Sequence, residues 1–320
     1  MIDQPGIYEL PAEVYHADPV GPAPSLSASI AKKLLGQSPL HANYAHPRLN
    51  PEYEREDSER FDLGTAVHAH LLEGETAFAV IDADDWRTKA AKDARELARL
   101  AGRVPLLREQ WERVQAMAAA ARTQLTRFSE PPRPLTGGVA ERVLVWYEEE
   151  LDIWCRARVD YLHDDYRTVD DLKSTGASAN PDLWTRTVLW NTGFDIQAAF
   201  YLRGLAVLTG VDATFRFVVQ ENYEPYALSV IGLEPEALAL AEKKRRLAVK
   251  LWAECLTTNR WPGYPTRTCY AALPPWLEAQ WLERELRDER PSARPARQTD
   301  IIDDGRPIGE QLAGMGELER

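Results

Sequence analysis

Two neighbouring segments in the middle of the chain alternate apolar and polar residues, and this pattern constrains the fold more than any other sequence feature. Residues 139–147 and 153–162 follow it, as half-buried β-strands do, because successive strand side chains point to opposite faces. The acidic stretch 148–152 lies between them and predicts a hairpin turn. Residues 168–173 predict a third strand. The centre of the chain therefore predicts a three-strand meander.

Helical spacing dominates on both sides of this meander. The later part predicts helices at 181–193, 194–208 and 235–258, and strands at 214–221 and 226–231. The order of predicted elements along the chain indicates a mixed α/β core with a helical N-terminal elaboration. That order is helices, three strands, a helix, two strands and a helix. We expect one domain over residues 1–285 and a flexible tail over 286–320, which is rich in Arg, Asp and Pro.

The N-terminal half is expected to be mainly helical. Residues 61–73 predict one helix. Residues 85–128 predict one or two long helices, in which Pro105 marks a break or a first turn. Residues 46–60 are polar and charged and predict an exposed loop.

Two carboxylates and a lysine lie at the ends of two predicted strands. Asp160 is in the second strand; Asp171 and Lys173 share one face of the third, while Asp170 points away. Carboxylates hold Mg²⁺, which would polarise a phosphate and activate a water molecule. The lysine could orient or deprotonate that water, or offset charge in the transition state. The group suits phosphodiester hydrolysis, although D-x-K alone is also typical of solvated strand ends.

Polar positions on two predicted helices add to this group. His68 lies one helical turn after Gly64 and is a possible metal ligand, whereas an isolated histidine is more often a hydrogen-bonded core residue. His70 points elsewhere on the same helix. Gln197 and Tyr201 are four residues apart. They form either one polar patch for a phosphate or base edge, or a helix face whose tyrosine packs in the core.

The bulk composition sets limits on partners and location. The formal net charge of -12 argues mildly against nucleic acid, but it does not say where the 38 basic residues lie. The three cysteines are scattered, which fits neither a disulfide framework nor a zinc or iron–sulfur pattern. No apolar run approaches the roughly 20 residues of a membrane span, and the first residues lack a signal-peptide layout. We expect a cytoplasmic protein with no membrane partner.

The order of these motifs resembles that of a known family. This order resembles the RecB/RecE-like branch of the PD-(D/E)XK nucleases. The motifs are, in sequence, G-x-x-x-H-x-x-x-L-E from Gly64, a strand aspartate at Asp160, D-x-K at Asp171 and Q-x-x-x-Y from Gln197. The segments 26–30, 38–39, 192–202, 261–264 and 273–276 resemble RecE-type (exonuclease VIII) exonucleases. The likeness covers roughly residues 25–280. It departs from the family at Val159, where proline often precedes the first aspartate.

This resemblance implies a PD-(D/E)XK nuclease core, in which helices flank a mixed central sheet. The implied metal ligands are His68, Asp160 and Asp171, for Mg²⁺ with Mn²⁺ as a substitute. The implied catalytic lysine is Lys173, and Gln197 and Tyr201 would complete the site beside the DNA. The resemblance also implies exonuclease action on ends of double-stranded DNA, 5′ to 3′, which leaves single strands for phage or host recombination. A ring-shaped homo-oligomer and a RecT-like annealing partner complete this expectation.

Three further residues near the group have open roles. Glu141 begins the first strand; such domains sometimes use an extra acidic residue, but a solvated strand glutamate is the simpler interpretation. Arg156 and Arg158 alternate on the strand that leads to Asp160. They could contact phosphate through the guanidinium fork, or form a surface ladder paired with the acidic turn.

Other functions stay open. A CRISPR-adaptation nuclease of the same superfamily usually holds an iron–sulfur cluster through four cysteines, which three scattered cysteines do not favour. A restriction-type endonuclease also fits the superfamily, although Q-x-x-x-Y favours the exonuclease branch. A non-catalytic DNA-binding scaffold would be expected to have lost Asp160, Asp171 or Lys173. A zinc hydrolase would need its histidines more tightly grouped than the six in this chain.

Overall fold

The computed structural model describes residues 1–53, 63–72, 74 and 78–288. The chain divides into two units, Met1–Tyr264 and Pro265–Arg320. The described part of the second unit contains one helix, α11 (Pro275–Asp288). Residues 286–288, which we expected to belong to a tail, lie in this helix, and the rest of that expected tail is outside the described residues.

The first unit is built on a mixed sheet with the strand order β1-β5-β6-β7-β8-β9. Strands β7 and β8 are parallel, and the other neighbours in this order are antiparallel. A short strand, β2, pairs in parallel with β6. The strands are β1 (Gly6–Glu9), β2 (Leu26–Ser27), β5 (Gly138–Glu148), β6 (Ile153–His163), β7 (Thr168–Thr175), β8 (Thr214–Glu221) and β9 (Leu228–Gly232).

The predicted hairpin and meander are confirmed. Strands β5 and β6 pair along nearly their whole length, and the acidic turn between them includes the short helix η2 (Glu149–Leu151). In contrast, β6 pairs with β7 over only two residues of each strand: Tyr161 lies opposite Asp170, and Leu162 opposite Val169. The two strands therefore diverge soon after their connecting turn, and the sheet opens between them.

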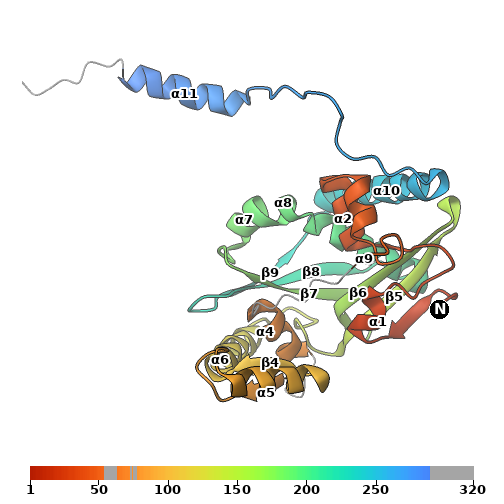
Figure 1. Cartoon of the computed structure of the whole chain (residues 1–320). Helices are drawn as coiled ribbons and strands as arrows, with labels where there is room; N and C mark the ends of the chain where they lie inside the picture. Colours follow the sequence, from red (N-terminus) through yellow and green to blue (C-terminus); the bar gives the residue numbers. More distant parts are fainter. Residues whose placement is uncertain (54–62, 73, 75–77, 289–320) are drawn as a thin grey trace, which may run out of the picture. The chain divides into compact units, whose positions relative to one another are not determined.

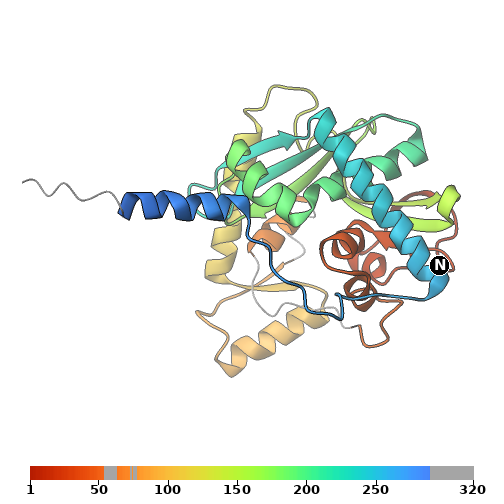
Figure 2. The same ribbon diagram turned by 90° about the horizontal axis from the view of Figure 1, so that it is seen from above.

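Helices cover one face of the sheet above this opening (Figures 1 and 2). The main ones are α2 (Ala28–Gly36), α9 (Phe194–Thr209) and α10 (Pro235–Thr258). They bury the main hydrophobic core, in which Trp146, Phe200 and Trp252 are fully buried. The shorter helices are α1 (Ala12–His16), α3 (Pro39–Tyr44), α7 (Pro181–Trp184) and α8 (Trp190–Thr192). The helix predicted over 181–193 is thus interrupted, by a π-helical turn (Thr185–Leu189).

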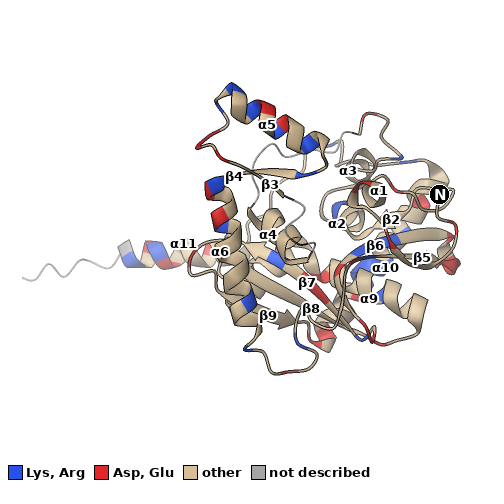
Figure 3. Ribbon diagram, turned by 90° about the horizontal axis from the view of Figure 1, so that it is seen from below, with Lys and Arg blue, Asp and Glu red and all other residues tan. Residues whose placement is uncertain are grey.

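A second group of elements lies on the other side of the sheet (Figure 1). It contains α4 (Leu63–Leu72), β3 (Phe78–Ile81), α5 (Lys89–Leu100), β4 (Val104–Leu107) and α6 (Arg108–Leu125). Its own small core includes Phe78, Leu106 and Met117. Figure 3 shows residues of both charges interspersed along α5.

The prediction of two helices within residues 85–128 is confirmed by α5 and α6, and Pro105 lies in the break between them. The break itself contains a strand that was not predicted, β4, which pairs in parallel with β3. The two strands form a sheet of their own, so each has an unpaired edge where a missing N–H costs no ladder hydrogen bond. The helix expected over 61–73 is present as α4, although residues 61, 62 and 73 lie outside the described residues.

A buried ionic group joins the N-terminal loop to the sheet. Arg156 is 3% exposed, donates to the Ser25 carbonyl oxygen (2.9 Å) and contacts Asp18 (2.9 Å). His46 is also buried; burial lowers its pKa to about 4, and its Nε2 lies 3.0 Å from the Ser25 carbonyl oxygen. Arg156 is therefore buried and paired with Asp18, rather than part of a surface ladder paired with the acidic turn. The loop predicted over 46–60 is not wholly exposed either.

Among the described residues, no helix has both the length and the apolar character needed to cross a membrane.

Close packing of α9 on β5 gives a test of the fold. A Cβ at Gly204 would lie 2.7 Å from the ring of Trp146, which is fully buried and cannot move aside. Gly204→Ala is therefore expected to lower the free energy of unfolding by about 1–3 kcal/mol. Gly36→Ala is the control, since no atom lies within 4 Å of its added Cβ; stability should stay or rise by up to about 1 kcal/mol. Urea unfolding measures both, and equal effects would contradict the packing argument.

Candidate active site

The site forms where β6 and β7 diverge. Asp160 Oδ2 accepts a hydrogen bond from the Leu172 backbone N–H at 2.9 Å, so a carboxylate satisfies a donor of β7 that no strand partner takes. The alternation of side chains also shifts here. Val159 and Leu162 both belong to the main core although they are three residues apart, which a regular strand does not allow. Opposite Asp160, Glu141 has a left-handed φ of 61°.

Helix α4 brings His68 to this irregular part of the sheet. His68 Nε2 lies 3.0 Å from Asp160 Oδ2, and its Nδ1 lies 3.6 Å from Glu141 Oε1. One ligand atom from each of the three residues lies within 4.8 Å of the other two. Three groups that are distant in sequence thus form one cluster with the donor types of a metal site.

Glu141 is not the solvated strand residue that we expected. Its side chain is 13% exposed, and its Oε2 forms an ion pair with Arg158 Nη2 at 2.8 Å. The sequence did contain a signal for it, because counting back from the hairpin turn places Glu141 opposite Asp160. The same ion pair places Arg158 beside the cluster, whereas Arg156 lies in the buried group described above.

Asp171 and Lys173 form the second half of the site. Asp171 is fully buried; its Oδ1 accepts a hydrogen bond from Gln197 Nε2 at 2.7 Å, and its Oδ2 is ion-paired with Lys173. The Lys173 ammonium also lies 5.0 Å from the ring centroid of Phe194. Asp170 faces the other way, toward His163 and Arg216. The prediction that Asp171 and Lys173 share a face without Asp170 is confirmed.

Mutual electrostatics set the charge of these groups. Burial and then the charge of Asp160 raise the pKa of Asp171 to about 6, against the opposite effect of Lys173. Burial lowers the pKa of His68, but the hydrogen bond and charge of Asp160 outweigh it, and the net shift is upward. Burial also lowers the pKa of Lys173, yet Asp171 and Asp160 raise it above its usual value. Lys173 is therefore an ammonium at neutral pH.

Tyr201, the second residue of the predicted helix pair, has mainly apolar surroundings. It is 8% exposed and belongs to the main core, where its ring contacts Phe215 edge-on at 6.0 Å. Burial raises the pKa of its hydroxyl well above the usual value, and the charges of Asp171 and Asp160 add to this effect. Of the predicted helix pair, Gln197 contacts the site carboxylate directly, and Tyr201 packs behind it.

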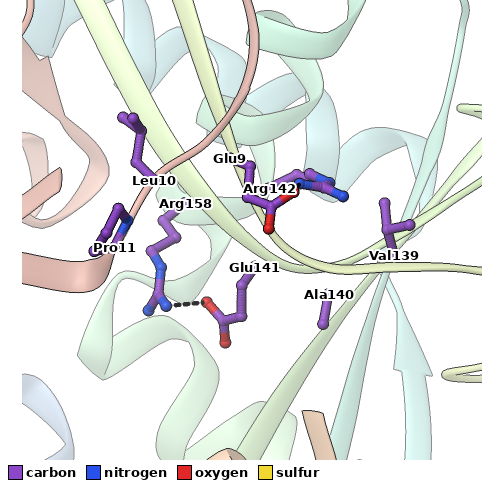
Figure 4. A pocket seen from close by; sticks show the side chains of 8 residues that line it. All are labelled: Glu9, Leu10, Pro11, Val139, Ala140, Glu141, Arg142 and Arg158. Atoms are coloured by element: carbon purple, nitrogen blue, oxygen red, sulfur yellow. Dashed lines mark hydrogen bonds and ion pairs between the residues drawn. The ribbon is translucent and has the colours of Figure 1, made fainter. Parts of the chain in front are cut away.

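A pocket of about 430 Å³ adjoins the cluster (Figure 4). Glu141 is one of its lining residues, and the others come from the end of β1, the segment after it, β5 and β6. Its two arginines face carboxylates: Arg142 pairs with Glu9, and Arg158 pairs with Glu141. These pairings leave the pocket with little net positive charge.

Comparison with known proteins identifies the family. A family described as "PDDEXK-like domain of unknown function (DUF3799)" matches residues 27–272. The chain belongs to this family. The expected fold of this PDDEXK-like chain, a mixed central sheet flanked by helices, is confirmed. No protein among those with curated descriptions matches it.

Solved structures add two distant likenesses. One, from Eubacterium rectale and provisionally named an exonuclease, is 15% identical, with a TM-score of 0.48 over 81% of this chain and 97% of that one. The other, SSO0001, is 10% identical, with a TM-score of 0.31 over 74% of this chain and 81% of that one.

The donor atoms of this PDDEXK-like site fit a small divalent cation. Opposite ligands of Mg²⁺ lie about 4 Å apart, and the atoms of His68, Glu141 and Asp160 are within 4.8 Å of one another. The two carboxylates are donors that suit Mg²⁺ and Mn²⁺, whereas the imidazole is a donor more typical of transition metals. Asp171 is not one of these three residues, but the charge of Asp160 raises its pKa, so the two carboxylates are close enough to interact.

Proposed function

We propose that this PDDEXK-like chain is a metal-dependent exonuclease that hydrolyses phosphodiester bonds of linear double-stranded DNA. One observation carries the proposal: the His68–Glu141–Asp160 cluster and the Asp171–Lys173 ion pair meet where β6 and β7 diverge. Membership of a PDDEXK-like family supports nuclease chemistry.

Each side chain of the site has a separate role in this proposal. His68, Glu141, Asp160 and Asp171 would hold Mg²⁺, or Mn²⁺ in its place. The bound ion would polarise the scissile phosphate and lower the pKa of a water molecule. Lys173 stabilises the negative charge that develops on the phosphate, because its raised pKa keeps it charged and makes it a poor base. Gln197 fixes the carboxylate of Asp171 through a hydrogen bond, and Tyr201 packs behind Gln197 as support.

The finer points of the proposal rest on the likeness of the motifs to RecE-type exonucleases. They are 5′ to 3′ polarity, a single-stranded product for recombination, a ring-shaped homo-oligomer, a RecT-like annealing partner and a cytoplasmic location.

End-labelled linear duplex and covalently closed circular duplex, each with Mg²⁺ or with EDTA, test the proposal. We expect linear DNA to be consumed from its ends in Mg²⁺, with closed circles intact and EDTA abolishing cleavage. Mn²⁺ should restore activity to the EDTA-treated protein. Label release from the 5′ end before the 3′ end reports polarity. Rapid cutting of closed circles would show an endonuclease, and full activity in metal-free buffer would refute the mechanism.

A further inference from the structure

One lysine beside the candidate active site has no role in the groups described so far. Lys32 lies on α2, and its Nζ is 5.0 Å from the ring centroid of Phe194. Its stem passes over the backbone of Gly193, where a Cβ would lie 3.2 Å from Lys32 Cγ. Lys173 Nζ is also 5.0 Å from the centroid of Phe194. The two ammonium groups are therefore no further apart than twice that distance.

The charge of Lys32 is not balanced by a carboxylate of its own. Among the residues that the structure describes, neither an ion pair nor a hydrogen bond is found for its ammonium. The neighbouring lysines differ, because Lys173 pairs with Asp171, and Lys244 pairs with Asp195 at 2.6 Å. Burial and then the charge of Lys173 lower the pKa of Lys32 to about 8, against the opposite effects of Asp171 and Asp195. An anion bound at this position would offset both the burial of the ammonium group and its repulsion by Lys173.

The other cations that the structure describes near the site are already paired. Arg158 and Arg142, which line the adjoining pocket, pair with Glu141 and Glu9. Arg156 pairs with the buried Asp18 of the N-terminal loop, and Arg216 pairs with the buried Asp170 of β7. Lys32 is thus the cation near the site best suited to an incoming phosphate, which ammonium groups bind through charge-assisted hydrogen bonds.

We propose that Lys32 binds a phosphate of the DNA strand near the one that is cleaved, and so positions the substrate. This inference rests on the proposed nuclease function. The alternative is that Lys32 serves only to pack its aliphatic stem over Gly193 and Phe194. The two roles need different parts of the side chain: packing needs the stem, and phosphate binding needs the charge.

Three variants separate these roles. Lys32→Met keeps an unbranched stem without charge, and Lys32→Arg keeps the charge. Lys33→Met removes the same charge from the next residue, which is exposed on α2. The affinity of each protein for a short fluorescent DNA duplex is measured by anisotropy in EDTA, where cleavage is excluded, at several salt concentrations. Steady-state cleavage in Mg²⁺ is measured in parallel.

We expect Lys32→Met to weaken binding about five- to tenfold and to reduce the slope of log affinity against log salt by about 0.9, the contribution of one phosphate contact. KM should rise more than kcat falls. Lys32→Arg should restore most of the affinity, and Lys33→Met should change it less than about twofold. Wild-type affinity and salt slope in Lys32→Met would overturn this inference while leaving the nuclease proposal standing. A wild-type chain that neither binds nor cleaves DNA would overturn both.

Discussion

Lys173→Met is expected to lower kcat/KM for duplex cleavage by about a thousandfold, the loss typical of one preorganised electrostatic donor. The Lys173 side chain is 18% exposed and paired with Asp171. Burial opposes its charge, but Asp171 and Asp160 hold its pKa above the usual value. The ammonium is thus fixed before substrate arrives. Methionine keeps the stem that packs near Phe194 and removes only the charge.

The readout must separate chemistry from folding and binding. Thermal melting should show a folded Lys173→Met protein, and its affinity for duplex in EDTA should stay within about tenfold of wild type, since one phosphate contact contributes no more than this. Lys250→Met, at an exposed position on α10, is the matched control and should cleave as wild type does. If Lys173→Met keeps more than a tenth of wild-type kcat/KM, the assignment of Lys173 to the catalytic group is wrong.

The affinity for Mn²⁺ is expected to fall by about a hundredfold or more as the pH is lowered from 7 to 5. In the metal-free protein the pKa of Asp171 is about 6, and that of His68 lies above its usual value. Below these values both groups carry a proton that the metal must displace, and each such proton weakens binding about tenfold per pH unit. The affinity for Mn²⁺ should therefore rise with pH and level off once His68 is neutral.

Isothermal titration calorimetry in buffers of different ionisation enthalpy measures both the affinity and the number of protons released. Near pH 5 we expect release of nearly two protons, falling toward zero above the pKa of His68. Asp171→Asn should lower the number of protons released near pH 5 by about one. Asp212→Asn, at an exposed carboxylate outside the cluster, should not change it. Binding that is independent of pH from 5 to 7 would contradict the ligand set.

Local pattern was enough to predict much of the fold. The alternation of residues 139–162 predicts the β5–β6 hairpin, and the helical spacing of residues 235–258 predicts α10 (Pro235–Thr258). Strand alternation also placed Asp171 and Lys173 together and Asp170 apart. Each of these results depends on periods of two or 3.6 residues, which the chain shows wherever one face of an element is buried.

Errors arose where distant segments decide the local conformation. Strand β4, which was not predicted between the two helices, forms because β3 lies beside it in parallel. Arg156 looks like a surface residue in sequence, but the loop that holds Asp18 and Ser25 packs over it. In each case the partner is more than 20 residues away, so no local period reports it.

The sequence alone therefore determined most elements of the central sheet, their order and several residues of the site. Tertiary structure decided which of them meet. Divergence of β6 from β7 opens the sheet at Asp160. The left-handed backbone at Glu141 interrupts the regular strand opposite Asp160. Helix α4 brings His68 to these two carboxylates. The physical reason is that a strand's periodicity fixes the face on which a side chain lies, whereas the point at which two strands separate depends on the packing of both sheet faces.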